Sequence, residues 1–562
     1  MKKVLSFLLL AFFIGLPLYA NTGKDPNLSA MLRELYRNKA NLQLKGYKRP
    51  YFISYALSDT DLFFVSGAAG AIIRKTRTRN SYMYVDCRVG DYQVDSSRYK
   101  GYDFSNSGPL RYVPGTVAPI DGNTDELQRG LWLLTDYKYK KALQNYLRVR
   151  ANAVTDIDNE NVPAWSHEYP FRLVEPVSAL KVGEAAYTDM VRRVTAETLK
   201  FPVIFDENMS VTAKRLIRYI VNTEDTVVRS TDKYYGIVIT LYARAKDGTL
   251  LSDMVTYYSR TPERLPDTKK VLHAVDAEIA ILKKLQNAPV LDPMTVPAIF
   301  MPGPAGVFFH ETIGHRLEGQ RQHGQNEGKT FRNYLNKQIL PAFINVYDDP
   351  TMETFQGIQL NGFYRVDDEG VPSRRVTLVK KGILKNFLMS RTPIKGFVHS
   401  NGHGRSNGAL RPVGRMGNLL VKADKTVSMA KLKEMLIAEV RRQHKPFGVI
   451  IAKVFGGSTN TSTYGYQAFK GTPVVMYKVD AKTGKQTLVR GVEVVGTPLT
   501  SIDKIMAASS NYGVFNGFCG AESGNVPVSA IAPAILMREV ELQRTPQPKQ
   551  RPIIIKPPGG IR

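Results

Sequence analysis

Two histidines five residues apart constrain this chain more than any other feature. They enclose the segment His310-Glu311-Thr312-Ile313-Gly314-His315, directly after an apolar run at residues 307–309. Neutral imidazole is the commonest protein ligand for zinc, and a glutamate beside an acidified water can act as a general base. The segment therefore predicts one edge of a hydrolytic metal site, and the third ligand must lie elsewhere in the sequence.

The spacing of His310 and His315 is unusual for a helix. Zinc proteases commonly place two histidines at i and i+4, about 40° apart around an ideal helix, whereas a separation of five residues gives about 140°. A widened π-type turn would return both imidazoles to one side, and such turns occur often at functional sites. We therefore predict a π-bulge or a helix end between His310 and His315, with Gly314 absorbing the distortion.

The chain has 562 residues, enough for two or three domains, and a formal net charge of +27. Such a charge suits either a solvated basic surface or contact with acidic peptides and anionic envelope surfaces. The sequence has no compact Lys/Arg run and no nucleic-acid-binding motif, so we expect no nucleic-acid partner.

Residues 1–20 have the pattern of a signal peptide. Lys2 and Lys3 precede an almost wholly apolar stretch at residues 5–19, and Ala20 offers a small residue for cleavage. An uncleaved membrane anchor is the alternative, although the apolar stretch is short for a membrane span. We therefore expect an exported protein that functions in a bacterial periplasm.

Cys87 and Cys519 are the only two cysteines in the sequence. In an oxidising compartment an even number favours a disulfide, but free structural thiols or a metal-bound thiolate also fit this count. The count alone leaves these three alternatives open.

The pattern of apolar residues predicts an α+β fold in two main parts. A proline-rich stretch at residues 287–304 places a boundary near 290, between an N-terminal α+β domain at 21–290 and a C-terminal metal-binding domain of short strands and tight turns at 291–543. Residues 544–562 form a basic, proline-rich tail that we expect to be disordered or extended. Helices are predicted at 27–43, 124–150, 183–199, 266–287 and from Ser428 to about 443. Strands are predicted at 51–55, 62–65, 81–85, 210–212, 227–230, 235–243, 376–380, 383–389, 448–454, 473–479 and 486–495.

The histidine segment belongs to a longer block, Val307-Phe308-Phe309-His310-Glu311-Thr312-Ile313-Gly314-His315-Arg316-Leu317-Glu318-Gly319. Further blocks follow at Asp367-Asp368-Glu369-Gly370-Val371-Pro372, Gly382-Ile383-Leu384-Lys385, Ser390-Arg391-Thr392, Gly402-His403-Gly404-Arg405, Arg415-Met416-Gly417-Asn418, Phe455-Gly456-Gly457 and Phe518-Cys519-Gly520. In this order the blocks resemble the TldD/PmbA family of metallopeptidases over about residues 295–540. Before residue 290 the resemblance extends only to the order of helices and strands.

In that family two histidines and a late cysteine bind zinc. By motif position the resemblance implies His310, His315 and Cys519 as the ligands of a zinc ion, and it makes the metal-bound thiolate the expected state of Cys519. Two neutral imidazoles and one thiolate leave an open fourth position for a water. Glu311 would be the catalytic general base that takes the proton of this water and passes it to the leaving amine.

Other residues are weaker candidates for a role at the site. His403 and Arg405 lie in a glycine-rich segment, where they would contact the substrate or stabilise the loop. Glu318 is the candidate for orienting a metal ligand. The acidic residues 367–369 are either further orienting groups or a solvated turn.

These features predict an exported zinc-dependent peptidase that hydrolyses amide bonds in small or unfolded peptides. The resemblance implies a dimer that encloses the active site, formed either by identical chains or with a paralogue. Two alternatives stay open: a non-catalytic envelope binding protein with a structural metal, and a zinc hydrolase that acts on non-peptide amides or esters.

Overall fold

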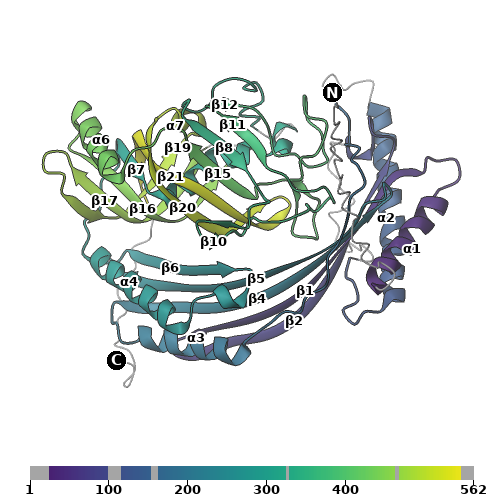
Figure 1. Ribbon diagram of the computed structural model, residues 1–562, viewed down its shortest axis with the longest axis horizontal. Helices are drawn as coiled ribbons and strands as arrows, with labels where there is room; N and C mark the ends of the chain where they lie inside the picture. The colour runs from purple at the N-terminus through teal and green to yellow at the C-terminus, as the bar shows by residue number, and fades with distance from the viewer. Residues whose placement is uncertain (1–24, 99–115, 153–161, 324–327, 463–467, 546–562) are drawn as a thin grey trace, which may run out of the picture.

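The computed structural model describes residues 25–98, 116–152, 162–323, 328–462 and 468–545. The predicted signal peptide at 1–20 and most of the predicted tail lie outside these residues. Helices combine with two large sheets, one of six and one of eleven strands, which confirms the predicted α+β class (Figure 1). The last strand of the six-stranded sheet ends at residue 259, and the first strand of the eleven-stranded sheet begins at residue 294. The domain boundary at 290 stays a prediction. None of the described helices is long and apolar enough to cross a membrane.

The six-stranded sheet has the order β2-β1-β4-β5-β3, with β6 also paired to β5. Its strands are β1 (Pro50–Ala68), β2 (Ala71–Val89), β3 (Arg172–Val174), β4 (Ile204–Asn222), β5 (Val227–Arg244) and β6 (Leu250–Ser259). Strand β1 is continuous, whereas the sequence predicted two short strands. Ser58, Asp59 and Thr60 interrupt its apolar pattern, but their backbones pair with both β2 and β4. Backbone pairing therefore continues where the hydrophobic signal stops.

Four helices cover one face of this sheet: α1 (Pro26–Asn41), α2 (Thr124–Asn152), α3 (Glu184–Thr198) and α4 (Thr268–Gln286) (Figure 1). Odd-numbered residues of β1, β4 and β5 face these helices and form two apolar clusters with them. All four helices were predicted, and α4 begins after Asp267, whose side chain accepts the backbone N–H of Lys270. The opposite face of the sheet is left for the C-terminal half of the chain (Figure 1).

The eleven-stranded sheet contains a closed ring, because β7, β16, β17, β19 and β21 pair in succession and β21 pairs back to β7. Its strands are β7 (Met294–Phe300), β8 (Ile344–Asp348), β11 (Val376–Lys380), β12 (Ile383–Leu384), β15 (Asn418–Ala423), β16 (Phe447–Thr459), β17 (Phe469–Asp480), β18 (Gln486–Val489), β19 (Val492–Gly496), β20 (Ile505–Ala521) and β21 (Gly524–Arg544). The prediction of only short strands in this half is wrong, since β20 and β21 have 17 and 21 residues. Glycine, serine and asparagine interrupt the apolar pattern of β20, so its sequence did not predict a strand.

Short elements complete the C-terminal half. They are helices α5 (Pro302–Phe309), α6 (Met429–Arg442) and α7 (Pro498–Ile502), and strands β9 (Thr354–Phe355), β10 (Ile358–Gln359), β13 (Gly404–Arg405) and β14 (Val413–Gly414). Helix α6 begins at the predicted cap, where the Ser428 hydroxyl accepts the backbone N–H of Lys431. Helix α5 follows β7 directly, and its residues Phe308 and Phe309 lie in the main apolar core. This buried helix gives the histidine segment a rigid base.

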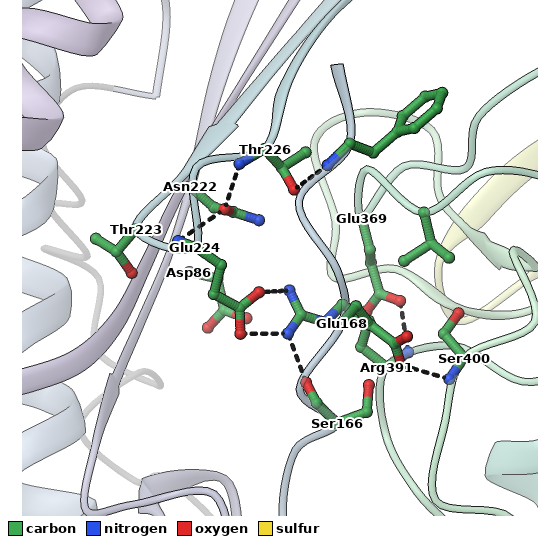
Figure 2. Close-up of polar contacts among 12 residues, drawn as sticks. Asp86, Ser166, Glu168, Asn222, Thr223, Glu224, Thr226, Glu369, Arg391 and Ser400 are labelled. Carbon is green, nitrogen blue, oxygen red and sulfur yellow. Dashed lines mark hydrogen bonds and ion pairs between the residues drawn. The ribbon is translucent and has the colours of Figure 1, made fainter. Parts of the chain in front are cut away.

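A buried arginine joins the two halves of the molecule (Figure 2). The Arg391 guanidinium lies 2.7 Å from the Glu224 carboxylate in the turn between β4 and β5, and it also donates to the carbonyl of Ser166. The backbone N–H of Arg391 donates to Glu369, so the same residue is anchored on its own side as well. Only 1% of the Arg391 surface is exposed. The contact between the halves therefore includes a charge pair shielded from water.

Candidate metal centre

The chain passes from α5 into a π-helical turn at His310–Gly314, followed by a 3₁₀ turn at His315–Leu317. This confirms the predicted distortion between the two histidines. The wider turn brings both imidazole rings to one side, with ring centroids 4.8 Å apart and ring planes at 87°. Both side chains are buried, so the turn presents two nitrogen donors in a shielded position.

Gly314 is required for a different reason from the one predicted. Its torsion angles, φ −54° and ψ −59°, are those of an ordinary helix, so its backbone does not absorb the distortion. A Cβ atom at this position would lie 2.0 Å from Sδ of Met416. The glycine therefore provides space for a buried methionine that packs against the π turn.

Cys519 approaches the two histidines from strand β20. Its Sγ atom lies 3.3 Å from Nε2 of His315, and the nearest donor atoms of His310, His315 and Cys519 all lie within 4.8 Å of one another. Cys519 is a free thiol, as is Cys87, which is buried in β2 within the other sheet. The disulfide alternative is therefore wrong.

The donor set fits a metal ion. Donors held by one zinc-like ion at about 2.0–2.3 Å in a tetrahedron are about 3.3–3.8 Å apart. The 3.3 Å between Cys519 and His315 falls in this range, and the other donor atoms lie within 4.8 Å. Among the residues that the structure describes, the cluster holds only these three side chains. Three protein ligands leave one position for water or substrate, which is the usual arrangement of a catalytic metal site.

Glu318 contacts His315, one of the three candidate ligands, from the side away from Cys519. Its Oε2 atom lies 3.2 Å from Nδ1 of His315, so a proton is held on Nδ1, and Nε2 faces Cys519. Glu318 is fully buried, and Arg321 and Arg415 also contact its carboxylate. Burial would raise the pKa of Glu318, but His315 and the two arginines lower it to about 2. The carboxylate is therefore held as an anion.

Arg415 links both parts of the ligand set, a role that the sequence analysis missed. Its Nε atom lies 3.4 Å from Glu318, behind His315, and Nη2 donates to the carbonyl of Cys519 over 2.7 Å. Nη1 donates to the Ser523 hydroxyl at the end of the same hairpin. The only signal in the sequence was the place of Arg415 in a family-like block. A fully buried guanidinium thus ties the π turn to strand β20.

The protonation states of His315 and Cys519 depend on each other. Burial would raise the pKa of the Cys519 thiol, but His315 and His310 lower it to about 4. Burial opposes charge on His315, but Glu318 and Cys519 raise its pKa well above the ordinary value. The site therefore favours a thiolate at neutral pH, which is the form that binds metal.

Glu311 lies in the π turn beside the ligands and is also buried. A Cβ atom added to Gly457 would lie 2.7 Å from Cγ of Glu311, so strand β16 must carry a glycine at this point. Burial raises the pKa of Glu311, although the histidines oppose the shift. A carboxylate with a raised pKa is suited to accept and return a proton near neutral pH.

A cavity of about 540 Å³ opens in front of these groups, and we call it the catalytic cavity. His310, Glu311, His315 and Cys519 line one side of it. Met254, Thr256 and Tyr258 of β6 line another, together with residues 455–459 of β16. The cavity therefore forms only where the two halves of the chain meet, which no local sequence pattern could predict.

His403 and Arg405 do not line this cavity. The imidazole of His403 is fully buried between Asp348, at 3.2 Å from Nε2, and Asn401. Arg405 stacks on the ring of Tyr364 and donates to the carbonyl of Met416. These positions favour the loop-stabilising alternative over contact with the substrate.

The acidic residues 367–369 are not a solvated turn. Asp367 accepts the backbone N–H groups of Gly404 and Val371, and Glu369 accepts that of Arg391. Burial raises the pKa of Asp367 well above its usual range, and it raises that of Glu369 to about 7. The turn binds the glycine-rich loop to the interface between the halves, and none of its acidic residues belongs to the cluster found among the described residues.

Fold and site together define a two-part α+β protein with a buried cluster of two histidines and one cysteine that could hold a metal ion. Residues 293–544 match the model of the PmbA/TldA metallopeptidase C-terminal domain. This C-terminal part of the chain is therefore a domain of the PmbA/TldA type, and proteins named metalloprotease are similar to it in sequence.

A protein of Archaeoglobus fulgidus named metalloprotease is 30% identical over 274 residues, which are 48% of this chain and 59% of that protein. A metalloprotease TldD homolog of Haemophilus influenzae is 29% identical over 284 residues, covering 50% and 54% of the two chains. The chain therefore matches little more than half the length of these curated relatives. The structure of TldE from Thermococcus kodakarensis superposes with a TM-score of 0.60 at 14% identity, covering 92% of this chain and 100% of that one. The fold is thus shared over both halves.

Proposed function

We propose that this chain is a zinc-dependent peptidase that hydrolyses amide bonds in short or unfolded peptides. The observation that carries the proposal is the convergence of His310, His315 and Cys519 with Glu311 at one buried cavity. The names of the curated relatives support metal-dependent proteolysis.

When bound, a zinc ion supplies the positive charge that acidifies a water and polarises the scissile carbonyl. The carboxylate oxygens of Glu311 accept the proton of the attacking water, and the raised pKa of this residue lets it hold the proton until the leaving nitrogen takes it. Glu318 keeps the proton on Nδ1 of His315, so Nε2 stays available to the metal. Arg415 holds Cys519 and Glu318 in a fixed relation throughout.

The size of the catalytic cavity supports a peptide as substrate. About 540 Å³ accommodates a few residues of an extended chain but not a folded domain. The walls come from two sheets, so a substrate has to enter between them. Short or unfolded peptides meet this requirement.

Metal content and thiol titration test the metal site. Protein purified without chelator should hold about one zinc per chain, and Cys519 should react with a thiol reagent only after the metal is removed. Cys87 serves as an internal control, because it is buried and burial raises its pKa. Metal-free protein with a reactive Cys519 would contradict the proposal.

The Glu311→Gln variant tests the general base. It should retain the metal and lose hydrolysis of unstructured peptides by a factor of about 10²–10⁴. Glu522→Gln is the matched control, because Glu522 lines the same cavity but pairs with Arg321 at its exposed side. Unchanged turnover in Glu311→Gln would remove Glu311 from the mechanism.

A substrate panel separates the alternatives. A peptidase should cleave unstructured peptides faster than simple esters and non-peptide amides, whereas a more general hydrolase should cleave all three. Metal binding without turnover of any member would favour a non-catalytic binding protein.

We further propose that the protein is exported and works as a dimer. Support for export comes from the pattern of residues 1–20, and support for the dimer comes from the resemblance to the family. The protein from fractionated cells should begin near residue 21, and light scattering should report about two chains per particle. A monomer that retains its first residues inside the cytoplasm would contradict both.

A further inference from the structure

Two phenylalanines are half-exposed in the catalytic cavity, beside the residues that would bind metal. Phe518 precedes Cys519 on β20 and is 50% exposed, and Phe455 on β16 is 44% exposed. Aromatic surface facing water is unfavourable, and apolar surface gathered in a cavity commonly marks a binding site. Both side chains therefore offer an apolar contact to a group that enters the cavity.

Tyrosines of the six-stranded sheet hold Phe518 in position. The ring of Tyr234 meets Phe518 edge-on with centroids 5.3 Å apart, and the ring of Tyr258 does so at 6.2 Å. The side chains of Tyr234 and Tyr258 are hydrogen-bonded to each other, and Tyr258 also lines the cavity. The aromatic group thus combines side chains from both halves of the molecule.

An ion pair joins the two walls of the cavity. Lys453 on β16 lies 2.6 Å from Asp253 on β6 and 2.8 Å from Glu278 on α4. Phe455 and Tyr258 lie on the same two strands, β16 and β6. The ion pair therefore fixes the spacing between them, and a preformed site loses less entropy when it binds a ligand.

A second cavity, of about 410 Å³, continues the apolar surface. Residues 455–458 line both cavities. Leu250 on β6 is 40% exposed and lines the second cavity. Exposed apolar side chains thus lie in both cavities, Phe518 in the first, Phe455 in both and Leu250 in the second, which suits an extended chain with large apolar side chains.

We propose that Phe518, Phe455 and Tyr258 form a subsite that selects peptides with a large apolar or aromatic side chain beside the scissile bond. The inference rests on the proposed peptidase function and adds the class of side chain that the site prefers. An apolar side chain would cover the half-exposed rings, while Ala would leave them in contact with water.

Matched peptides that carry one Phe, Leu or Ala in an otherwise constant Ala/Gly sequence test the subsite. With the zinc-loaded full chain, mass spectrometry of the products should place the cut beside Phe or Leu, with kcat/KM about tenfold above that of the Ala peptide. Phe518→Ala should bring the Phe/Ala ratio of kcat/KM close to one. Phe455→Ala should also lower this ratio, and it provides the test if Phe518→Ala binds metal poorly. Phe205→Ala is the control, because Phe205 is 37% exposed but lines neither cavity.

Binding of the same peptides to zinc-loaded Glu311→Gln, followed by fluorescence anisotropy, separates the two levels of the argument. Equal hydrolysis and equal binding of the Phe and Ala peptides would overturn the subsite and leave the peptidase function intact. A second outcome is that the unaltered chain hydrolyses neither peptide, the Phe peptide binds more tightly than the Ala peptide, and the added substitution Phe518→Ala removes this difference. That result would support the subsite and overturn the peptidase function. An unaltered preference with a changed oligomeric state in Phe518→Ala would assign the rings to an interface between copies and overturn the subsite.

Discussion

The Sδ atom of Met416 lies where a side chain at position 314 would begin, at 2.0 Å from an ideal Cβ on Gly314. The loop after β14 is therefore packed directly against the π turn. Arg405 donates to the carbonyl of Met416 and so anchors this loop. The placement of the histidines depends in this way on a segment that is distant in the sequence.

Gly314→Ala should destabilise the protein by about 1–3 kcal/mol, because the added methyl group overlaps with Met416. Urea unfolding measures this loss, and metal titration should show weaker binding because the turn must shift. Gly303→Ala in α5 is the control, since its Cβ would meet no atom within 4 Å and alanine favours a helix. The double variant Gly314→Ala/Met416→Ala should recover part of the stability, and a double variant no better than Gly314→Ala would refute the steric explanation.

Arg415→Lys should weaken metal binding by about 10–100-fold, because one ammonium group cannot contact both Glu318 and the carbonyl of Cys519. Competition with a chromophoric chelator gives the affinity. Arg441→Lys is the control, because Arg441 on α6 also donates to a carbonyl but lies away from the site. Equal affinities in the two variants would remove Arg415 from the support of the ligands.

Cys519→Ser should lose most of its metal, because a hydroxyl does not provide the anionic donor that the thiol provides with its lowered pKa. Cys87→Ser should keep its metal, because Cys87 lies in the core of the other half. Elemental analysis after gel filtration measures both variants. Full occupancy in Cys519→Ser would exclude this residue from the ligand set.

Arg391→Met should cost about 3–5 kcal/mol of stability, because it leaves the Glu224 carboxylate buried without its partner. The double variant Arg391→Met/Glu224→Gln should lose less, since no unpaired charge remains. Lys431→Met removes an exposed ion pair with Glu434 on α6 and should change stability by no more than about 0.5 kcal/mol. Denaturant unfolding compares the three, and a loss in Arg391→Met no larger than in Lys431→Met would refute the role of the buried pair.

Stability should fall between about pH 4.5 and pH 7 because of Glu278. Burial and the nearby Asp253 raise its pKa from 4.5 to about 7, against the opposing effect of Lys453. The folded state therefore binds the proton more tightly than the unfolded state, so this stabilisation is complete below pH 4.5 and is lost as the pH rises through 7. Thermal unfolding of Glu278→Gln should show a smaller decrease over this range, and parallel curves for both proteins would contradict the assignment.

The histidine spacing predicted the π turn because the geometry of a helix is local. The same holds for α6, whose first turn is fixed by Ser428 and the apolar residues that follow. The prediction that Cys519 lies beside the two histidines had another origin. It followed from the resemblance to a family and not from the pattern of residues around Cys519. Nothing within β20 indicates which element it will face.

The roles of His403 and Arg415 could not be predicted for the same reason. A histidine between glycines is compatible with an open binding loop, and only the packing of Asp348 from β8 shows that its imidazole is enclosed. Arg415 lies in a loop whose sequence gives no sign of burial, yet its partners come from the π turn and from the β20–β21 hairpin. Contacts between distant segments decide both cases.

The closed strand ring has a consequence for the biosynthesis of the protein. Residues 294–300 of β7 can complete their pairing only with residues 535–542 of β21, which are made more than two hundred residues later. Pairing between such distant segments is slow to form. During synthesis, one edge of β7 therefore stays unpaired until β21 has been made. The thiol donor on β20 is synthesised equally late. A chain that has not yet been translated past Cys519 thus cannot bring the three candidate ligands together, and any activity that depends on them would begin only after β20 and β21 have been made.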